Sequence, residues 1–155
     1  MIFYKMKNKD KEVFIKSKEV LLTKDDIREF AVKNNIVEED VEWNEAYLVP
    51  TSDYTEHLLS RVYTAFSNEL ENIKQSWIGK TPDEICSMCY MAVYISDVMN
   101  AIDNADASEF DFEALERWLK DPKKMVETIC ECITNRNNSD YNEAICDYIN
   151  QGMED

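Results

Sequence analysis

Glycine and proline are scarce in this sequence of 155 residues. The two glycines and three prolines stand far apart, at Gly79, Gly152, Pro50, Pro82 and Pro122. Because sandwiches and barrels need such residues at their many turns, the scarcity favours helices. It also excludes a phosphate-binding loop, which needs several glycines within a few residues.

Residues that commonly carry catalysis are also few. His57 is the single histidine, so the most common general base and metal ligand is nearly absent. No GxSxG motif marks a nucleophilic serine, and the acidic segments lack the glycine and register of an EF-hand calcium loop. We therefore expect a non-catalytic protein that uses no metal and no cofactor.

Long apolar runs are missing as well. No run approaches the roughly 20 residues that cross a membrane, and the apolar run near Met1 is too short for a signal peptide. Five cysteines are an odd number, which suits free thiols in a reducing compartment. These features predict a cytoplasmic protein without a membrane partner.

Basic residues are outnumbered by acidic ones, 17 to 32, which gives a formal net charge of −15. Residues 51–155 carry 21 Asp and Glu against 8 Lys and Arg, so most of the excess lies there. Binding to nucleic acid needs the opposite sign, since its affinity comes largely from neutralised phosphates. We expect no direct nucleic-acid partner and a basic or neutral protein partner. The alternative is that the acidity only keeps the protein soluble.

The first fifty residues show the patterns of a small mixed element. Residues 2–6 and 12–16 are rich in β-forming side chains and flank a polar turn, which predicts a hairpin. Thr23, followed by Asp25 and Asp26, is typical of a helix start. Residues 43–49, which end before Pro50, predict a third strand. The order predicted for residues 1–50 is therefore ββαβ.

From residue 51 onward the apolar spacing becomes helical. Helices are predicted over 53–78, from Thr81, over 111–120, from Pro122, and in a last segment that includes Tyr141. Thr81 and Glu84 form a capping box with Pro82 at the first helical position. The sequence thus predicts an α+β fold, mainly α, in which a ββαβ element (1–50) precedes a four- to five-helix bundle (51–155).

The cysteines offer two interpretations. Cys86 and Cys89 form a CxxC motif, to which Cys130, Cys132 and Cys146 could add zinc ligands. Both residues of the motif lie inside the helix that starts at Thr81, on its predicted apolar stripe, whereas structural zinc sites usually place CxxC in a turn. We therefore predict core thiols and keep the zinc site as the alternative.

Two segments concentrate carboxylates without an intervening Lys or Arg. The first surrounds a tryptophan and contains Glu38, Glu39, Asp40, Glu42, Trp43 and Glu45. The second contains Asp103, Asp106, Glu109, Asp111 and Glu113. One interpretation is an ordinary solvated surface. The other is an array that imitates phosphates and binds a basic groove, which makes these residues candidates for partner binding.

A pattern of residues in the second part of the chain resembles a known family. It consists of Trp77, Pro82-Asp83-Glu84-Ile85, Tyr90, Tyr94, Asp97-Val98-Met99, Leu115 and Leu119-Lys120-Asp121-Pro122, within residues 58–152. The pattern resembles a small helical domain family of unknown function from Gram-positive bacteria, often found on conjugative elements. The resemblance implies a mobile-element setting, in which acidic anti-CRISPR and antirestriction proteins are common.

Charge and resemblance together give the functional expectation. We expect a non-catalytic inhibitor that occupies the basic nucleic-acid-binding groove of a CRISPR or restriction nuclease. The alternative is a structural or adaptor subunit of a conjugative element, with no nuclease target. A small enzyme ranks last, because the sequence marks no catalytic site. The oligomeric state stays open.

Overall fold

The computed structural model describes residues 1–134 and 141–152 of the chain. It divides into two compact units, residues Met1–Tyr54 and Thr55–Asp155, which we describe separately. The described residues form one three-stranded antiparallel sheet and six α-helices. The predicted α+β fold, mainly α, is therefore confirmed.

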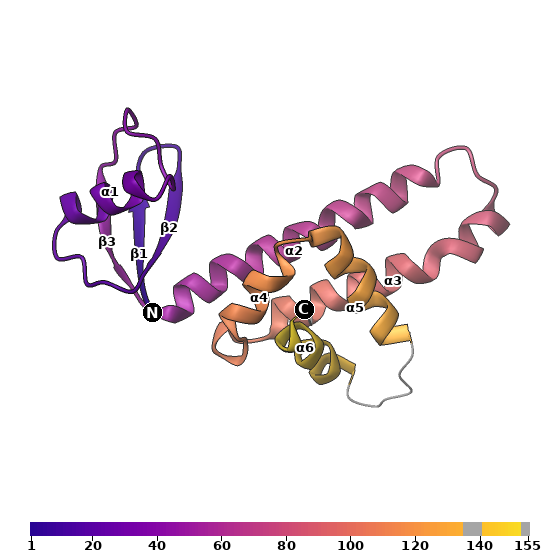
Figure 1. Ribbon diagram of the computed structural model, residues 1–155. Helices are drawn as coiled ribbons and strands as arrows, with labels where there is room; N and C mark the ends of the chain where they lie inside the picture. The colour runs from indigo at the N-terminus through magenta and orange to yellow at the C-terminus, as the bar shows by residue number, and fades with distance from the viewer. Residues whose placement is uncertain (135–140, 153–155) are drawn as a thin grey trace. The chain divides into compact units, whose positions relative to one another are not determined.

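The first unit contains the sheet and one helix (Figure 1). Its elements are β1 (Ile2–Lys7), β2 (Glu12–Ser17), α1 (Lys24–Lys33) and β3 (Glu45–Val49). The strand order is β2-β1-β3, with Tyr4 opposite Ile15 in β2 and opposite Leu48 in β3. The hairpin and the ββαβ order match the sequence prediction, although β3 begins two residues later than expected.

Both ends of α1 are set by local side-chain chemistry. The Thr23 hydroxyl accepts a hydrogen bond from the Asp26 backbone N–H at 3.1 Å, and the Asp26 carboxylate accepts one from the Thr23 N–H at 2.8 Å. This capping box begins the helix. Asn34 ends it, and Asn35 has a φ of 56°, a left-handed conformation that asparagine tolerates.

The core of this unit lies between the sheet and α1. Alternate residues of a strand face the same side, so the buried side chains of Tyr4 and Met6 pack with Ile15 and with Ile27 of α1. Phe3 faces the other side, where it stacks on Tyr54 with ring centroids 4.4 Å apart.

The second unit is helical. The helices are α2 (Thr51–Ser76, whose first residues belong to the first unit), α3 (Pro82–Asn104), α4 (Phe112–Trp118), α5 (Pro122–Thr134) and α6 (Tyr141–Gln151), with a short 3₁₀ turn η1 (Ala107–Glu109). The capping box of Thr81 and Glu84 is present at the start of α3. Five α-helices form the bundle among the described residues, within the predicted four to five.

Packing in the bundle is centred on the C-terminal half of α3 and on α4–α6. Side chains without exposed surface there include Ile95, Leu115, Met125, Ile145 and Ile149. The indole N–H of Trp118 in α4 donates a hydrogen bond to the Ile149 carbonyl of α6 at 3.0 Å. Since a buried N–H without an acceptor costs stability, this bond fixes α4 against α6.

Candidate functional site

The second acidic segment begins at Asp103 in the last turn of α3 and crosses η1 into the first turn of α4. The side chains of its five carboxylate residues (Asp103, Asp106, Glu109, Asp111 and Glu113) are all exposed. We call these five residues the acidic loop. Among the described residues, none of the five forms an ion pair with a Lys or Arg side chain, so the negative charges are unneutralised by neighbours.

Backbone hydrogen bonds hold the acidic loop in a defined conformation. The Asp106 carboxylate accepts the Ser108 N–H at 2.8 Å and caps η1, and the Asp111 carboxylate accepts the Glu113 N–H at 3.0 Å and caps α4. Asn150 of α6 accepts a hydrogen bond from the Asp111 N–H at 2.9 Å and donates one to the Glu109 carbonyl at 2.8 Å. Hydrogen bonds from Asn150 therefore hold the middle of the loop, at Glu109 and Asp111, against α6.

One carboxylate of this loop has a perturbed acidity. The pKa of Asp106 is lowered from its ordinary value, because the Ser108 backbone N–H and hydroxyl favour the charged form. Asp106 thus keeps its negative charge at more acidic pH than a free aspartate.

The first acidic segment lies in the other unit and has different surroundings. Its carboxylates Glu38, Glu39, Asp40, Glu42 and Glu45 are exposed. The Arg28 guanidinium donates to the Glu39 carbonyl at 3.0 Å, and the Lys24 ammonium donates to the Asn44 carbonyl at 2.7 Å. Basic side chains therefore accompany this segment, in contrast to the acidic loop.

Trp43 is not the surface aromatic that the sequence suggested. Only 5% of its surface is exposed, and it belongs to the core formed with Tyr4, Met6, Ile15 and Ile27. Its indole N–H is shielded from solvent and has no acceptor among the described residues. A buried ring cannot contact a partner without unfolding this unit, so the prediction of Trp43 as a binding residue is wrong.

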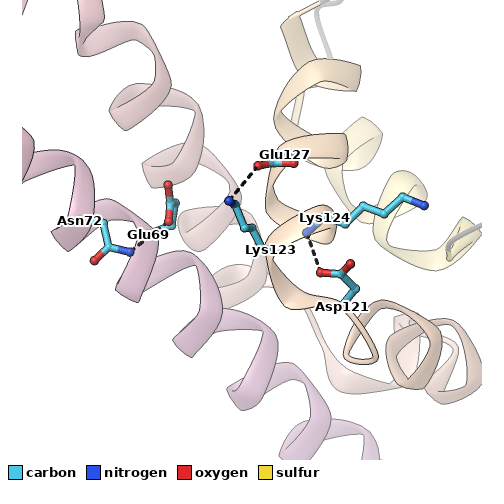
Figure 2. Close-up of polar contacts among 6 residues, drawn as sticks. All are labelled: Glu69, Asn72, Asp121, Lys123, Lys124 and Glu127. Carbon is cyan, nitrogen blue, oxygen red and sulfur yellow. Dashed lines mark hydrogen bonds and ion pairs between the residues drawn. The ribbon is translucent and has the colours of Figure 1, made fainter.

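A groove lies between α2 and α5, and no pattern in the sequence predicted it (Figure 2). It has a volume of about 500 Å³ and is lined by Arg61, Thr64, Ala65, Asn68, Glu69, Asn72, Leu119, Pro122, Lys123, Val126 and Glu127. The Lys123 ammonium lies 4.0 Å from the Glu127 carboxylate, and Asn72 donates to Glu69 at 3.1 Å. The groove therefore combines two carboxylates, Glu69 and Glu127, with the basic side chains of Arg61 and Lys123, and no thiol or imidazole lines it.

The cysteines are distributed differently from the predicted core. Cys86 is exposed and Cys89 is half-buried, with its thiol donating to the Cys86 carbonyl at 3.2 Å. The prediction that both thiols are buried in the core is wrong, because the described helices α5 and α6 lie along the C-terminal part of α3 and not along its first turns (Figure 1). Cys130 is buried, and burial, reinforced by the negative charge of Glu69, raises the pKa of its thiol to about 12.

Metal ligands are not gathered in the part of the chain that the structure describes. No group of three or more His, Cys, Asp or Glu side chains is placed there to hold a metal ion. Cys130 and Cys132 lie on α5, whereas Cys86 and Cys89 lie in the first turns of α3.

Comparisons with known proteins found no match among protein-family models, curated proteins or solved structures.

Proposed function

We propose that this protein is a non-catalytic inhibitor that binds a basic protein surface through the acidic loop, as nucleic acid would. The partner class that suits this chemistry is a nucleic-acid-binding enzyme of the cytoplasm, such as a CRISPR or restriction nuclease. The mobile-element setting that points to nucleases is an implication of the sequence resemblance alone. The charge argument is independent of it.

The observation that carries the proposal is the charge of the acidic loop, exposed and unneutralised. Most protein surfaces mix the signs of their charges, but residues 97–116 contain no Lys or Arg. The two capping aspartates and Asn150 hold the backbone, so little order must be imposed when a partner binds. Complementary charge raises the association rate and selects partners with the opposite sign.

The test is inhibition of DNA cleavage by purified CRISPR and restriction nucleases. The inhibitor variant carries Asp103→Asn, Asp106→Asn, Asp111→Asn and Glu113→Gln. Asparagine also caps helices, so the local fold is kept, and circular dichroism checks this. Because exposed charges contribute about 0.2–1 kcal/mol each, the four changes together should weaken inhibition by a factor between about 4 and several hundred.

A matched control removes the same number of charges elsewhere in the same unit. Glu56, Asp83, Glu143 and Asp147 are exposed, and their joint change to the amides should leave inhibition within about threefold of the parent. Equal weakening by both variants would mean that only the overall charge matters. If the parent inhibits no nuclease, the proposal fails and the adaptor function takes its place.

A further inference from the structure

The groove between α2 and α5 takes no part in the proposed inhibition. All its lining residues belong to the second unit, and its volume of about 500 Å³ lies within the range of small-ligand sites, about 300–1,000 Å³. Its floor is apolar, since Val126 of α5 is buried and Ala65 of α2 is half-buried. An apolar floor between charged walls suits a ligand with an apolar body and polar ends.

The charged side chains of the groove are divided between its two ends. Arg61 and Glu69 are eight residues apart on α2, so their Cα atoms are separated by about 12 Å along the helix. Burial and then the charge of Glu69 raise the pKa of the Cys130 thiol on α5 to about 12. Glu69 therefore lies beside the part of α5 that carries Glu127 and Cys130, and Arg61 lies two turns of α2 away from it.

Lys123 neutralises only part of the acidic end. Its ammonium lies 4.0 Å from the Glu127 carboxylate, and Figure 2 shows its side chain extending from α5 toward Glu69 on the opposite wall. One lysine and two carboxylates leave a single negative charge at this end. Arg61 forms no ion pair or hydrogen bond among the residues that the structure describes, so the other end is positive. The groove thus has opposite charges at its two ends.

Two asparagines lie along the α2 wall of the groove. Asn68 and Asn72 are four residues apart and so share a face of the helix. Asn72 donates a hydrogen bond to Glu69 at 3.1 Å, which leaves its carbonyl oxygen available. Asn68 forms no hydrogen bond within the described part of the chain. Because an asparagine amide contains both a donor and an acceptor, these side chains can pair with the N–H and C=O groups of a peptide.

We propose that the groove binds a short free peptide, with the peptide carboxylate at Arg61 and the peptide ammonium at Glu69 and Glu127. An extended chain spans at most about 3.3–3.6 Å per residue, so the two charged ends of a tripeptide or tetrapeptide are about 10–14 Å apart. This range includes the spacing of Arg61 and Glu69 along α2. Small apolar side chains of the peptide lie on Ala65 and Val126, and its amide groups face Asn68.

The arrangement of charges distinguishes this ligand from other small molecules. A phosphate ion pairs with Arg61 but is repelled by the carboxylates at the other end. A single amino acid holds its two charges within about 4 Å and cannot reach both ends. Nucleobases are commonly held by stacking on aromatic side chains, and among the described lining residues none is aromatic.

The exposure of the groove sets the strength of the expected binding. The side chains of Lys123 and Glu127 are 83% and 58% exposed, and ion pairs open to water are weak because the solvent screens them. Each charged end of the peptide should therefore contribute about a two- to fivefold gain in affinity. We expect a dissociation constant on the order of millimolar.

The test is an NMR titration of the isotope-labelled full chain with tetraalanine at low salt. The backbone N–H signals of residues 61–72 and 122–127 should shift and saturate, with a dissociation constant on the order of millimolar. Tetraalanine that is acetylated at its amino end and amidated at its carboxyl end has the same length and no charge. It should bind about 4- to 25-fold more weakly, because both charged contacts are lost. Alanine itself should bind more weakly than trialanine or tetraalanine.

Two variants assign the ends of the peptide to the ends of the groove. Arg61→Gln should no longer distinguish tetraalanine from its carboxyl-amidated form, because the contact to the carboxylate is lost. Glu69→Gln with Glu127→Gln should no longer distinguish tetraalanine from its N-acetylated form. The control, Glu71→Gln with Lys74→Gln, changes exposed positions of α2 that do not line the groove and should bind tetraalanine as the parent does.

The blocked peptides test the proposal without any change to the chain. Equal affinity for tetraalanine and its doubly blocked form would overturn it, as would shifts confined to residues outside the groove. The absence of any shift at about 20 mM tetraalanine would overturn it too. Equal shifts with sodium acetate would show that Arg61 binds any small anion and that no peptide is recognised. The acidic-loop variant should bind tetraalanine normally, which separates this result from the proposed inhibition.

Discussion

The two halves of α3 are similar in composition and opposite in burial. From Ala92 onward α3 buries Ala92, Ile95, Val98, Ala101 and Ile102, whereas no residue of α3 before Ala92 is buried. Both halves are rich in apolar side chains. The difference comes from the neighbours: α5 and α6 pack on α3, and in Figure 1 they lie along its C-terminal part. The sequence therefore shows which side chains are apolar, and the positions of the surrounding helices decide which of these side chains are buried.

The stability of the two halves consequently rests on different interactions. Burial stabilises the C-terminal half by about 1.5–3 kcal/mol for each large apolar side chain. The N-terminal half depends on its capping box and on backbone hydrogen bonds, which contribute less. Three changes would sharpen or break this comparison.

The largest expected effect is the loss of a buried side chain. Ile95 has no exposed surface, so Ile95→Ala should lower the free energy of unfolding by about 2–5 kcal/mol through lost burial and the cavity left behind. Val93→Ala, two residues away, should change it by less than about 0.5 kcal/mol because the side chain is exposed. Urea denaturation measures both. Equal losses at the two positions would show that the Val93 side chain is covered after all.

A smaller effect is expected at the start of α3. Thr81→Ala removes the hydroxyl that accepts the Glu84 backbone N–H and should cost about 1 kcal/mol. Because no core supports this end, the loss should appear as faster hydrogen exchange over residues 82–91, with little change in α5 and α6. The control is Thr23→Ala, which removes the same kind of cap from α1. Uniformly faster exchange throughout the second unit after Thr81→Ala would show that the N-terminal half of α3 does not unfold independently of α5 and α6.

The smallest expected effect is on pH dependence, with opposite signs in the two halves. The pKa of Glu84 is lowered from 4.5 by hydrogen bonds from the Thr81 backbone N–H and hydroxyl. This stabilisation is present above pH 4.5 and is lost as the pH falls through the lower folded value. The pKa of Asp97 is raised from 3.8 by burial, so its charged form opposes folding above the raised value and this penalty disappears near pH 3.8.

Two variants test these two contributions to the pH dependence of stability separately. Glu84→Gln should be less stable than the parent at pH 7, and the difference should shrink as the pH falls below 4.5. Asp97→Asn should be more stable than the parent at pH 7, with an advantage that also shrinks on acidification. Urea titrations at a series of pH values give both differences. An Asp97→Asn variant that is less stable at pH 7 would show that the carboxylate makes a favourable interaction.

Local chemistry explains why parts of the fold were predictable. The hairpin of residues 2–17 follows from alternation of side chains around a polar turn, and the capping box of Thr81 and Glu84 follows from residues three apart. The helix start at Thr23 follows from the aspartates that come shortly after it. These features depend on neighbours in sequence. Helix ends were accurate to within about two residues because caps, prolines and Gly79, with its φ of 81°, mark them.

Burial could not be predicted in the same way. Trp43, beside exposed carboxylates, was expected at the surface and lies in a core with Ile27, because the helix α1 packs on the sheet. Cys86 was expected in a core and is exposed, because α5 and α6 do not cover the start of α3. The groove is lined by Arg61 and Lys123, which lie some sixty residues apart in the sequence. No local sequence pattern therefore predicts it.

The sequence by itself determined the class of fold, the ends of most elements, the excess of negative charge and the carboxylate-rich segment without Lys or Arg. Each of these depends on composition or on residues a few positions apart. Only the tertiary structure decided that Asn150 is hydrogen-bonded to the acidic loop, that Trp43 is buried, and that no residue between Phe66 and Ala92 is buried. The physical reason is that burial and long-range hydrogen bonds are properties of pairs of distant segments. A helix carries its apolar face in its own sequence, but the cover for that face comes from elsewhere in the chain or from another molecule.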